Sequence, residues 1–133
     1  MRVRCVATSL TSQQKALLRI TTAATPEYQI IPGNTYLVLG ITFIHPTAPH
    51  GGGIRYEILN DFGNCLGIPA CLFEIEDARC SRYWLSRQNS DNALVLWPEA
   101  FLADYFHDDL SEGIAGAVDA FRRVVNQLKG EFE

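Results

Sequence analysis

Short runs of alternating or continuous hydrophobic residues along the first three quarters of the chain predict a series of β-strands. Residues 36–44 are the clearest case, because they are apolar on both faces, as in a central strand that is covered from both sides. Gly40 within this run predicts a sharp bend or a close approach of another backbone. Residues 54–59 alternate as a half-buried strand does. Further strands are predicted at residues 2–7, 28–31, 71–76, 82–86 and 93–97.

The C-terminal part of the chain changes to helical spacing. Apolar residues recur at intervals of three and four over residues 110–129, and Gly130 fits the end of this helix. A proline followed by an acid opens a shorter helix over residues 98–106. Residues 11–18 are typical of one or two helical turns with a Thr or Ser cap. Polar turns are predicted at residues 32–34, 60–64 and 88–92, the last closing a hairpin.

Together these elements predict an α+β fold in a single domain, residues 1–133. Several short strands packed between residues 36 and 97 favour a small bent antiparallel sheet or an SH3-like barrel. The C-terminal helix is expected to pack on that sheet, because its apolar face needs a partner. A chain of 133 residues is long enough to bury a hydrophobic core without a disulfide or a metal ion to hold it together.

Composition and charge exclude several classes of protein. Hydrophobic residues make up 47% of the chain and charged residues 20%, which is typical of a globular protein rather than a disordered one. The net charge of -4 and the pI near 5.3 argue against nucleic-acid binding, because phosphate neutralisation needs a basic face. No stretch approaches the roughly 20 apolar residues of a membrane span, and the chain start alternates instead of running apolar as a secretory signal does. The expectation is a cytoplasmic protein without a membrane or nucleic-acid partner.

The cysteines and histidines predict neither a metal site nor a cofactor. The four cysteines lack the paired spacing of a zinc or redox site and are expected to be free, mostly buried thiols. A Cys–His nucleophile pair is formally possible, because a cysteine could meet a histidine in space, but no motif marks an activated thiol. His45 and His50 lie in the loop 45–53, which is rich in Gly and Pro and is expected to be a flexible surface segment. The cysteines are Cys5, Cys65, Cys71 and Cys80.

Charge is distributed unevenly, and most of the acidic block has a local structural explanation. Residues 88–121 hold seven carboxylates and no Lys or Arg, whereas residues 1–26 hold four basic residues and no acid. Asp109 and Glu112 have the spacing of a capping box at the start of the long helix. The remaining explained acids are Glu99 in a first helical turn, Asp91 in a turn, and Asp119 four residues before Arg123 as an ion pair.

Two pairs of acids have no such explanation. Asp104 and Asp108 are four residues apart and share a face if the short helix extends that far, which costs free energy for like charges. Glu74 and Glu76 lie on one face of a strand. We therefore predict that these four acids form the electrostatic surface that binds a basic partner, with Trp84 or Trp97 as aromatic anchors if either is exposed.

A family resemblance adds a function to this surface. The strands and turns that carry it are Tyr36-Leu-Val-Leu-Gly-Ile-Thr-Phe, Ile54-Arg-Tyr-Glu-Ile-Leu-Asn-Asp, Pro69-Ala-Cys-Leu-Phe-Glu-Ile-Glu-Asp, Tyr83-Trp84 and Trp97-Pro-Glu-Ala-Phe101. Over residues 36–108 the chain resembles bacterial immunity proteins of polymorphic-toxin and contact-dependent growth inhibition systems. The resemblance implies a non-enzymatic cytosolic protein that binds and neutralises a cognate toxin domain, such as a nuclease with a basic cleft. Contact residues do not transfer within such a group, so it assigns none here.

Two alternatives stay open. A small-molecule-binding module or small enzyme would have its site near the loop His45–Gly53 and would need converging His and Cys side chains in a concave pocket. A nucleic-acid-binding barrel would need a basic strip. The basic residues available for such a strip are Arg55, Arg79, Arg82 and Arg87.

Overall fold

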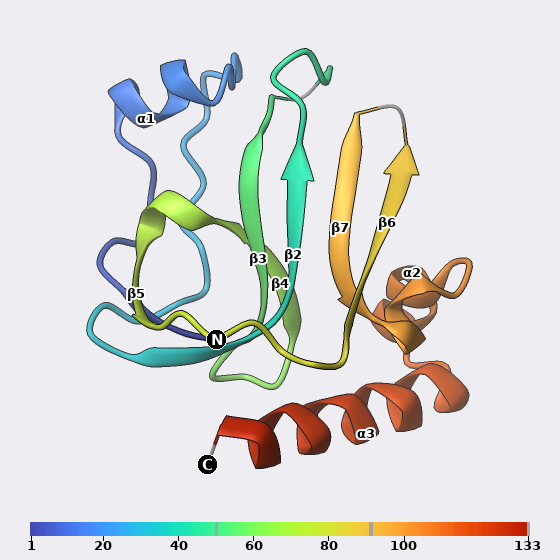
Figure 1. The fold of residues 1–133 in the computed structure, drawn as a ribbon. Helices are drawn as coiled ribbons and strands as arrows, with labels where there is room; N and C mark the ends of the chain where they lie inside the picture. Colours follow the sequence, from blue (N-terminus) through green and yellow to red (C-terminus); the bar gives the residue numbers. More distant parts are fainter. Residues whose placement is uncertain (50, 91, 133) are drawn as a thin grey trace.

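The computed structural model describes residues 1–49, 51–90 and 92–132, and in these residues seven strands and a long C-terminal helix build an α+β fold (Figure 1). The strands are β1 (Arg2–Cys5), β2 (Thr35–Ile44), β3 (Gly53–Leu59), β4 (Cys65–Pro69), β5 (Phe73–Asp77), β6 (Trp84–Ser90) and β7 (Ala93–Pro98). The helices are α1 (Ser12–Leu17), α2 (Phe106–Ser111) and α3 (Ala115–Phe132), with short 3₁₀ helices η1 (Ala70–Leu72) and η2 (Glu99–Leu102). The predicted fold class is confirmed.

All strands join one antiparallel sheet that bends around β2. The main path runs β4-β3-β2-β1-β5, and β7 pairs with β2 and β6. β2 pairs with β1 through residues 35–37 and with β7 through residues 41–44, while β3 runs along its other edge. In the part of the chain that the structure describes, β4 and β5 do not pair with each other, so the sheet is open rather than a closed barrel.

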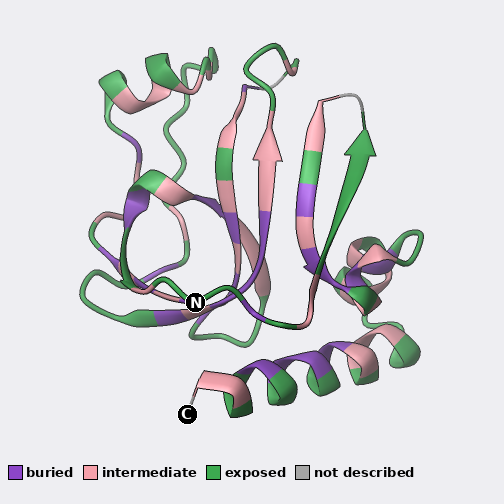
Figure 2. Ribbon diagram, viewed as in Figure 1, coloured by how far each residue is buried: buried purple, intermediate pink, exposed green. Residues whose placement is uncertain are grey.

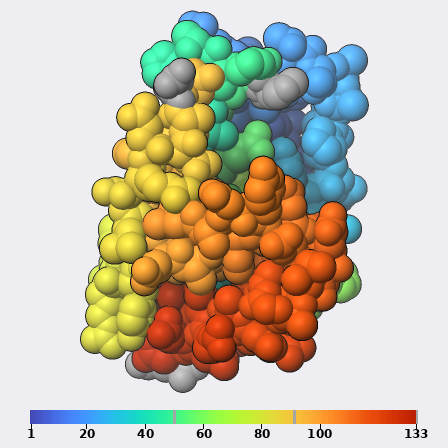
Figure 3. All heavy atoms as spheres, turned by 90° about the vertical axis from the view of Figure 1, so that its right-hand side faces the viewer, coloured from blue at the N-terminus to red at the C-terminus, as the bar shows by residue number. Residues whose placement is uncertain are grey.

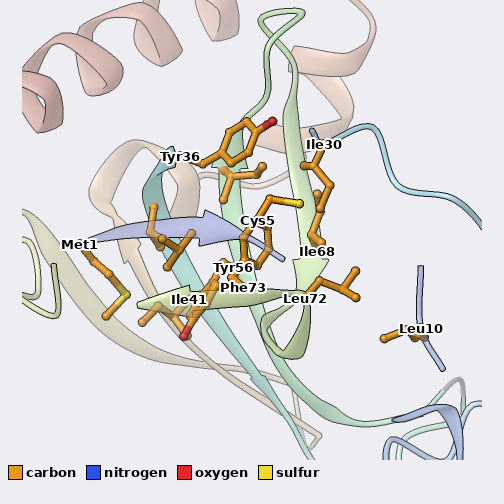
Figure 4. Packing of buried hydrophobic residues seen from close by; sticks show 13 residues of the cluster. Met1, Cys5, Leu10, Ile30, Tyr36, Ile41, Tyr56, Ile68, Leu72 and Phe73 are labelled. Carbon is orange, nitrogen blue, oxygen red and sulfur yellow. The ribbon is translucent and has the colours of Figure 1, made fainter. Parts of the chain in front are cut away.

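Each face of the sheet buries its own set of side chains. The sheet core lies inside the bend (Figure 4) and consists of Met1, Val3, Cys5, Leu10, Ile30, Tyr36, Val38, Ile41, Tyr56, Ile58, Ile68, Leu72 and Phe73. The helix core lies between the other face and the C-terminal helices and consists of Leu39, Val95, Trp97, Phe101, Phe106, Phe121, Val124, Val125 and Leu128. In Figure 2 the buried side of α3 faces the sheet, as its amphipathic spacing predicts.

A β-bulge in β2 determines on which face of the sheet each of its side chains lies. The register with β3 shifts between Val38 and Gly40. Val38 and Ile41 both enter the sheet core although they are three residues apart, which an uninterrupted strand cannot achieve. A Cβ at Gly40 would lie 2.7 Å from Cδ1 of Trp97, so only glycine leaves room for this side chain on β7. The same Cβ would lie 3.0 Å from the carbonyl oxygen of Leu96, so the predicted close approach of another backbone at Gly40 is confirmed.

The predicted helix boundaries need correction. Residues 110–129 do not form one helix, because α2 ends at Ser111 and Gly113, with φ +74°, separates it from α3. Asp109 consequently lies in the first turn of α2, and its predicted capping box with Glu112 is wrong. The shorter predicted helix, 98–106, is present only as η2, which retains Glu99 in its first turn.

The other local predictions divide between confirmed and wrong. α1 has the expected cap, a reciprocal capping box between Thr11 and Gln14. The hairpin β6–β7 forms, but β6 extends to Ser90 and so into the predicted turn. Residues 28–31 are not a strand, and β4 was missed. Predictions for His50 and Asp91 concern positions outside the described residues.

The two ends of the described chain lie close together (Figure 1). Nη2 of Arg2 donates to the carbonyl of Phe132 at 3.5 Å. Near the end of α3, the Glu131 carboxylate accepts hydrogen bonds from Ser81 Oγ and from the backbone N–H of Arg82, both at 2.7 Å. The end of α3 is therefore fastened to β1 and to the segment before β6. No helix among the described residues is both long and apolar enough to cross a membrane.

Candidate functional site

The acidic pair on β5 is held within the sheet. Glu74 and Glu76 are exposed and both form ion pairs with Arg4 of β1, at 3.6 Å between Arg4 Nε and Glu76 Oε1. Thr35 Oγ1 also donates to Glu76 at 2.9 Å. Much of the negative charge of this pair is therefore compensated by its own neighbours.

The second acidic pair lies elsewhere and is arranged differently from the prediction. Asp104 belongs to the turn before α2, whereas Asp108 is inside α2, so the two do not share a helix face. Tyr105 lies between them in a left-handed conformation, with φ 61° and ψ 18°, and begins the helix. β5 and α2 lie on opposite sides of the molecule (Figure 1), so the predicted joint surface of all four acids does not form.

Around α2 the structure places an exposed aromatic ring among unpaired acids. Tyr105 is 76% exposed, and its backbone conformation is uncommon for a bulky residue. We call Asp104, Tyr105, Asp108 and Glu112 the α2 surface; α2 and the turn before it, in orange, cross the middle of the face in Figure 3.

The acids near α2 have no ionic partners. Within residues 1–49, 51–90 and 92–132, no basic side chain lies within 4.0 Å of a carboxylate between residues 99 and 119. The predicted Asp119–Arg123 ion pair is accordingly not formed. Arg87 comes near this region but donates to the carbonyl of Leu102 at 2.9 Å instead of to an acid. The α2 surface therefore has uncompensated negative charge.

Both tryptophans contribute to packing. Trp97 is 8% exposed, and its Nε1 donates to Thr42 Oγ1 at 3.2 Å. Trp84 is half-buried and donates to the carbonyl of Leu39 at 2.8 Å. The exposure that would make Trp97 an aromatic anchor is absent, and the indole N–H of Trp84 is already used inside the protein.

A polar cluster that sequence reasoning missed lies under α2. A carboxylate oxygen of Glu57, Sγ of Cys65 and a ring nitrogen of His107 all lie within 4.8 Å of one another. Glu57 pairs with Gly67 and Leu59 with Cys65 across β3 and β4, so Glu57 and Cys65 are diagonal neighbours on one face. The third member, His107, comes from the first turn of α2. We call Glu57, Cys65 and His107 the polar cluster.

Neighbouring side chains orient two members of the polar cluster. Thr42 Oγ1 accepts the Trp97 N–H and donates to Glu57 Oε1 at 3.4 Å, which links the carboxylate to β2 and β7. The His107 ring packs against Trp97, with ring centroids 4.8 Å apart, and against Phe101 and Phe106. His107 is therefore fixed within an aromatic environment.

Burial shifts all three members of the polar cluster toward their neutral forms. Desolvation raises the pKa of Glu57 despite the hydrogen bond from Thr42. Desolvation, with Glu57 as a second cause, raises the pKa of the Cys65 thiol far above its ordinary range. Desolvation lowers the pKa of His107. His107 Nε2 is also buried without a hydrogen-bond partner, an arrangement that costs about 1–3 kcal/mol.

A groove of about 690 Å³ gives access to the polar cluster. It lies between the turn after β3 and the helices α2 and α3, and both Cys65 and His107 line it. Glu57 is behind them and does not line the groove. Apolar side chains such as Leu59, Leu110 and Phe121 form much of the remaining wall. A ligand in this groove would thus meet a sulfur and an imidazole on a wall that also includes polar residues such as Asn64 and Arg122.

The structure gives less support to the two alternative sites, the loop His45–Gly53 and the basic strip of arginines. His45 is exposed and contacts Thr47 Oγ1 at 2.7 Å, and the shallow groove beside it, about 320 Å³, contains no cysteine among the described residues. The convergence of His and Cys that this alternative needs occurs at the polar cluster instead. In the proposed basic strip, Arg79 is paired with Asp77, Arg82 contacts Tyr83 and Arg87 contacts Leu102.

Comparisons of the chain with family models, curated proteins and solved structures gave no match. The two candidate regions are therefore interpreted from their own geometry.

Proposed function

We propose that this chain is a non-enzymatic immunity protein that binds and neutralises a basic bacterial toxin domain, such as a nuclease, in the cytosol. The observation that carries the proposal is the exposed Tyr105, which stands between Asp104 and Asp108, two acids that form no ion pair with any other described residue. The resemblance of residues 36–108 to immunity proteins supports the same conclusion.

The acids and the tyrosine of the α2 surface would contribute to binding in different ways. Unpaired carboxylates attract a basic partner over a distance and raise the association rate, an effect that salt weakens. An exposed tyrosine can then anchor the complex, because it buries a large rigid ring at little cost in conformational entropy. The partner that suits this surface is a basic cleft large enough to admit one aromatic ring.

The test is coexpression of the chain with the toxin domain encoded by the neighbouring gene, followed by kinetics with the purified pair. We expect the wild-type chain to restore growth and to bind the toxin domain more slowly as salt is raised. Asp104→Asn with Asp108→Asn should lower the association rate by about 10-fold at low salt. Tyr105→Ala should cost about 2 kcal/mol, roughly 30-fold in Kd, mainly through faster dissociation.

Glu74→Gln with Glu76→Gln provides the matched control, because it removes the same charge from β5 on the opposite side. It should leave the association rate within about 2-fold of wild type, as screened distant charges contribute little. Equal losses in both double variants would show that only net charge matters. Unchanged binding of Tyr105→Ala and of the Asp104/Asp108 variant would exclude the α2 surface as the binding site.

A further inference from the structure

The polar cluster brings together three different metal-ligating atoms inside an apolar layer. Sulfur, imidazole nitrogen and carboxylate oxygen are the three donor types that zinc accepts in proteins. They come from β3, β4 and α2 and lie within 4.8 Å of one another. We infer that Glu57, Cys65 and His107 form a site for a divalent transition-metal ion of the zinc type at the base of the groove under α2.

The distances require only a small closure of the cluster. Tetrahedral zinc with bond lengths of about 2.0–2.3 Å places neighbouring donors about 3.5 Å apart. The present separations are at most 4.8 Å, so movements of about 1 Å in the side chains would complete the geometry. Glu57 and Cys65 start from paired strands, which limits how far either has to move.

Charge balance also favours a divalent cation. A carboxylate, a thiolate and a neutral imidazole carry two negative charges, which one divalent ion neutralises within a buried site. The groove wall also includes Arg122, which is exposed to solvent, so its charge is screened.

Three further features around the polar cluster fit a metal site. His107 Nε2 is buried without a hydrogen-bond partner, and a neutral imidazole can coordinate a metal through either ring nitrogen. Thr42 supports Glu57 from behind, as hydrogen bonds to metal ligands commonly do. Opposite Glu57, Gly67 leaves the carboxylate room, because a Cβ there would lie 3.2 Å from Glu57 Oε1.

The competing interpretation is a cysteine nucleophile activated by histidine. That mechanism needs a thiolate and a hydrogen bond between the cysteine and the histidine. No hydrogen bond joins Cys65 to His107 among the described residues, and Nε2 of His107 is buried without a partner. Coordination needs no such hydrogen bond, because a metal-bound cysteine releases its proton to solvent as the metal–sulfur bond forms.

Coordination leaves one position facing the groove. Cys65 and His107 line the groove while Glu57 lies behind, so the fourth ligand would be water or a group that enters from the groove. The bound ion would also fasten α2 to β3 and β4 through His107, which lies in α2 next to Asp108. The inference does not depend on toxin binding, because it concerns donors beneath the helix and not the exposed residues on it.

The experiment is metal titration of the full chain, stripped of metal and kept reduced. Zinc is titrated in competition with a chromophoric chelator, and cobalt(II) is added in a parallel sample. We expect one ion per chain, and for cobalt a thiolate-to-metal charge-transfer band with the visible bands of tetrahedral coordination. Glu57→Gln, Cys65→Ser and His107→Gln should each weaken zinc binding by at least about 100-fold, since even supporting residues are worth 10–100-fold.

Cys71→Ser and Cys80→Ser are the matched controls, because both remove an exposed thiol outside the polar cluster. They should bind zinc as the wild type does. Circular dichroism identifies any ligand variant that fails to fold, and the cobalt spectrum of the wild type then decides alone. The inference is overturned by a wild type that binds no zinc, by a cobalt spectrum without a thiolate band, or by ligand variants that retain wild-type affinity.

Discussion

Gly40 lies at the β-bulge of β2 and leaves room for Trp97, which packs on His107 of the polar cluster. The stability of Gly40→Ala measures how much this packing contributes to the folded state. The added Cβ would lie 2.7 Å from Trp97 Cδ1 and 3.0 Å from the carbonyl oxygen of Leu96. The carbonyl is part of β7, so the tryptophan ring has to move. Its movement would disturb the hydrogen bond from Trp97 to Thr42 and the packing of the ring on His107.

The expected loss of stability follows from three contributions. Overpacking of a core typically costs 1–3 kcal/mol, and a weakened Trp97–Thr42 hydrogen bond costs about 1 kcal/mol. Alanine offsets about 0.5–1 kcal/mol of this, because glycine loses more backbone entropy on folding. We therefore expect Gly40→Ala to lower the free energy of unfolding by about 2 kcal/mol.

Urea denaturation followed by circular dichroism measures this difference. With a slope of about 2 kcal/mol per molar, the midpoint should fall by about 1 M while the slope stays constant. Gly130→Ala is the matched control, because nothing lies within 4 Å of the added Cβ and the residue is in α3. That variant should be more stable than wild type by about 0.5–1 kcal/mol. A Gly40→Ala midpoint equal to or above that of wild type would refute the packing argument.

Two further substitutions examine individual side chains. Tyr105→Gly should be about 1 kcal/mol more stable than Tyr105→Ala in thermal or urea denaturation, because only glycine adopts the left-handed conformation at φ 61° without a steric penalty; equal stabilities would contradict the assigned conformation. Tyr36→Phe removes a hydroxyl that accepts the Ile31 N–H at 2.8 Å and donates to Asp61, so it should cost about 1–2 kcal/mol at neutral pH. Burial and the Asp61 hydrogen bond raise the pKa of Tyr36 from 10.0 to about 12, so the unfolded chain loses this proton first and wild-type stability should fall between those pH values. Tyr36→Phe should not show this loss of stability between pH 10 and about 12 when denaturation is measured as a function of pH. If wild type and variant lose the same stability over this range, the assigned role of the Tyr36 hydroxyl is wrong.

Local chemistry predicted several elements of the fold, whereas the break at Gly113 and the strand β4 were missed. The cap of α1 and the length of β2 follow from local chemistry and hydrophobicity. The break at Gly113 was missed because the apolar spacing stays in phase from Leu110 to Val118 on both sides of it. β4 contains both glycine and proline, which disfavour a strand, and it becomes one through its pairing with β3.

The same distinction explains what was predicted about the candidate sites. Charge counting identified Asp104 and Asp108, but it could not identify Tyr105, whose exposure depends on an unusual backbone conformation. The polar cluster needs the register of β3 with an unpredicted strand and the position of a helix more than 40 residues later. The spacing of residues along the chain does not show which of them lie close together in the fold, so the proximity of Cys65 and His107 was not predicted.

The closeness of the two chain ends has a practical consequence for measuring the proposed interactions. Arg2 reaches the carbonyl of Phe132, and both ends lie apart from α2 in Figure 1. A tag or surface tether at either end therefore leaves Tyr105 and its neighbouring acids facing solution. A short linker between the ends would close the backbone into a ring, and the chain could then be reopened in the exposed segment 21–27, with its sheet and both cores unchanged.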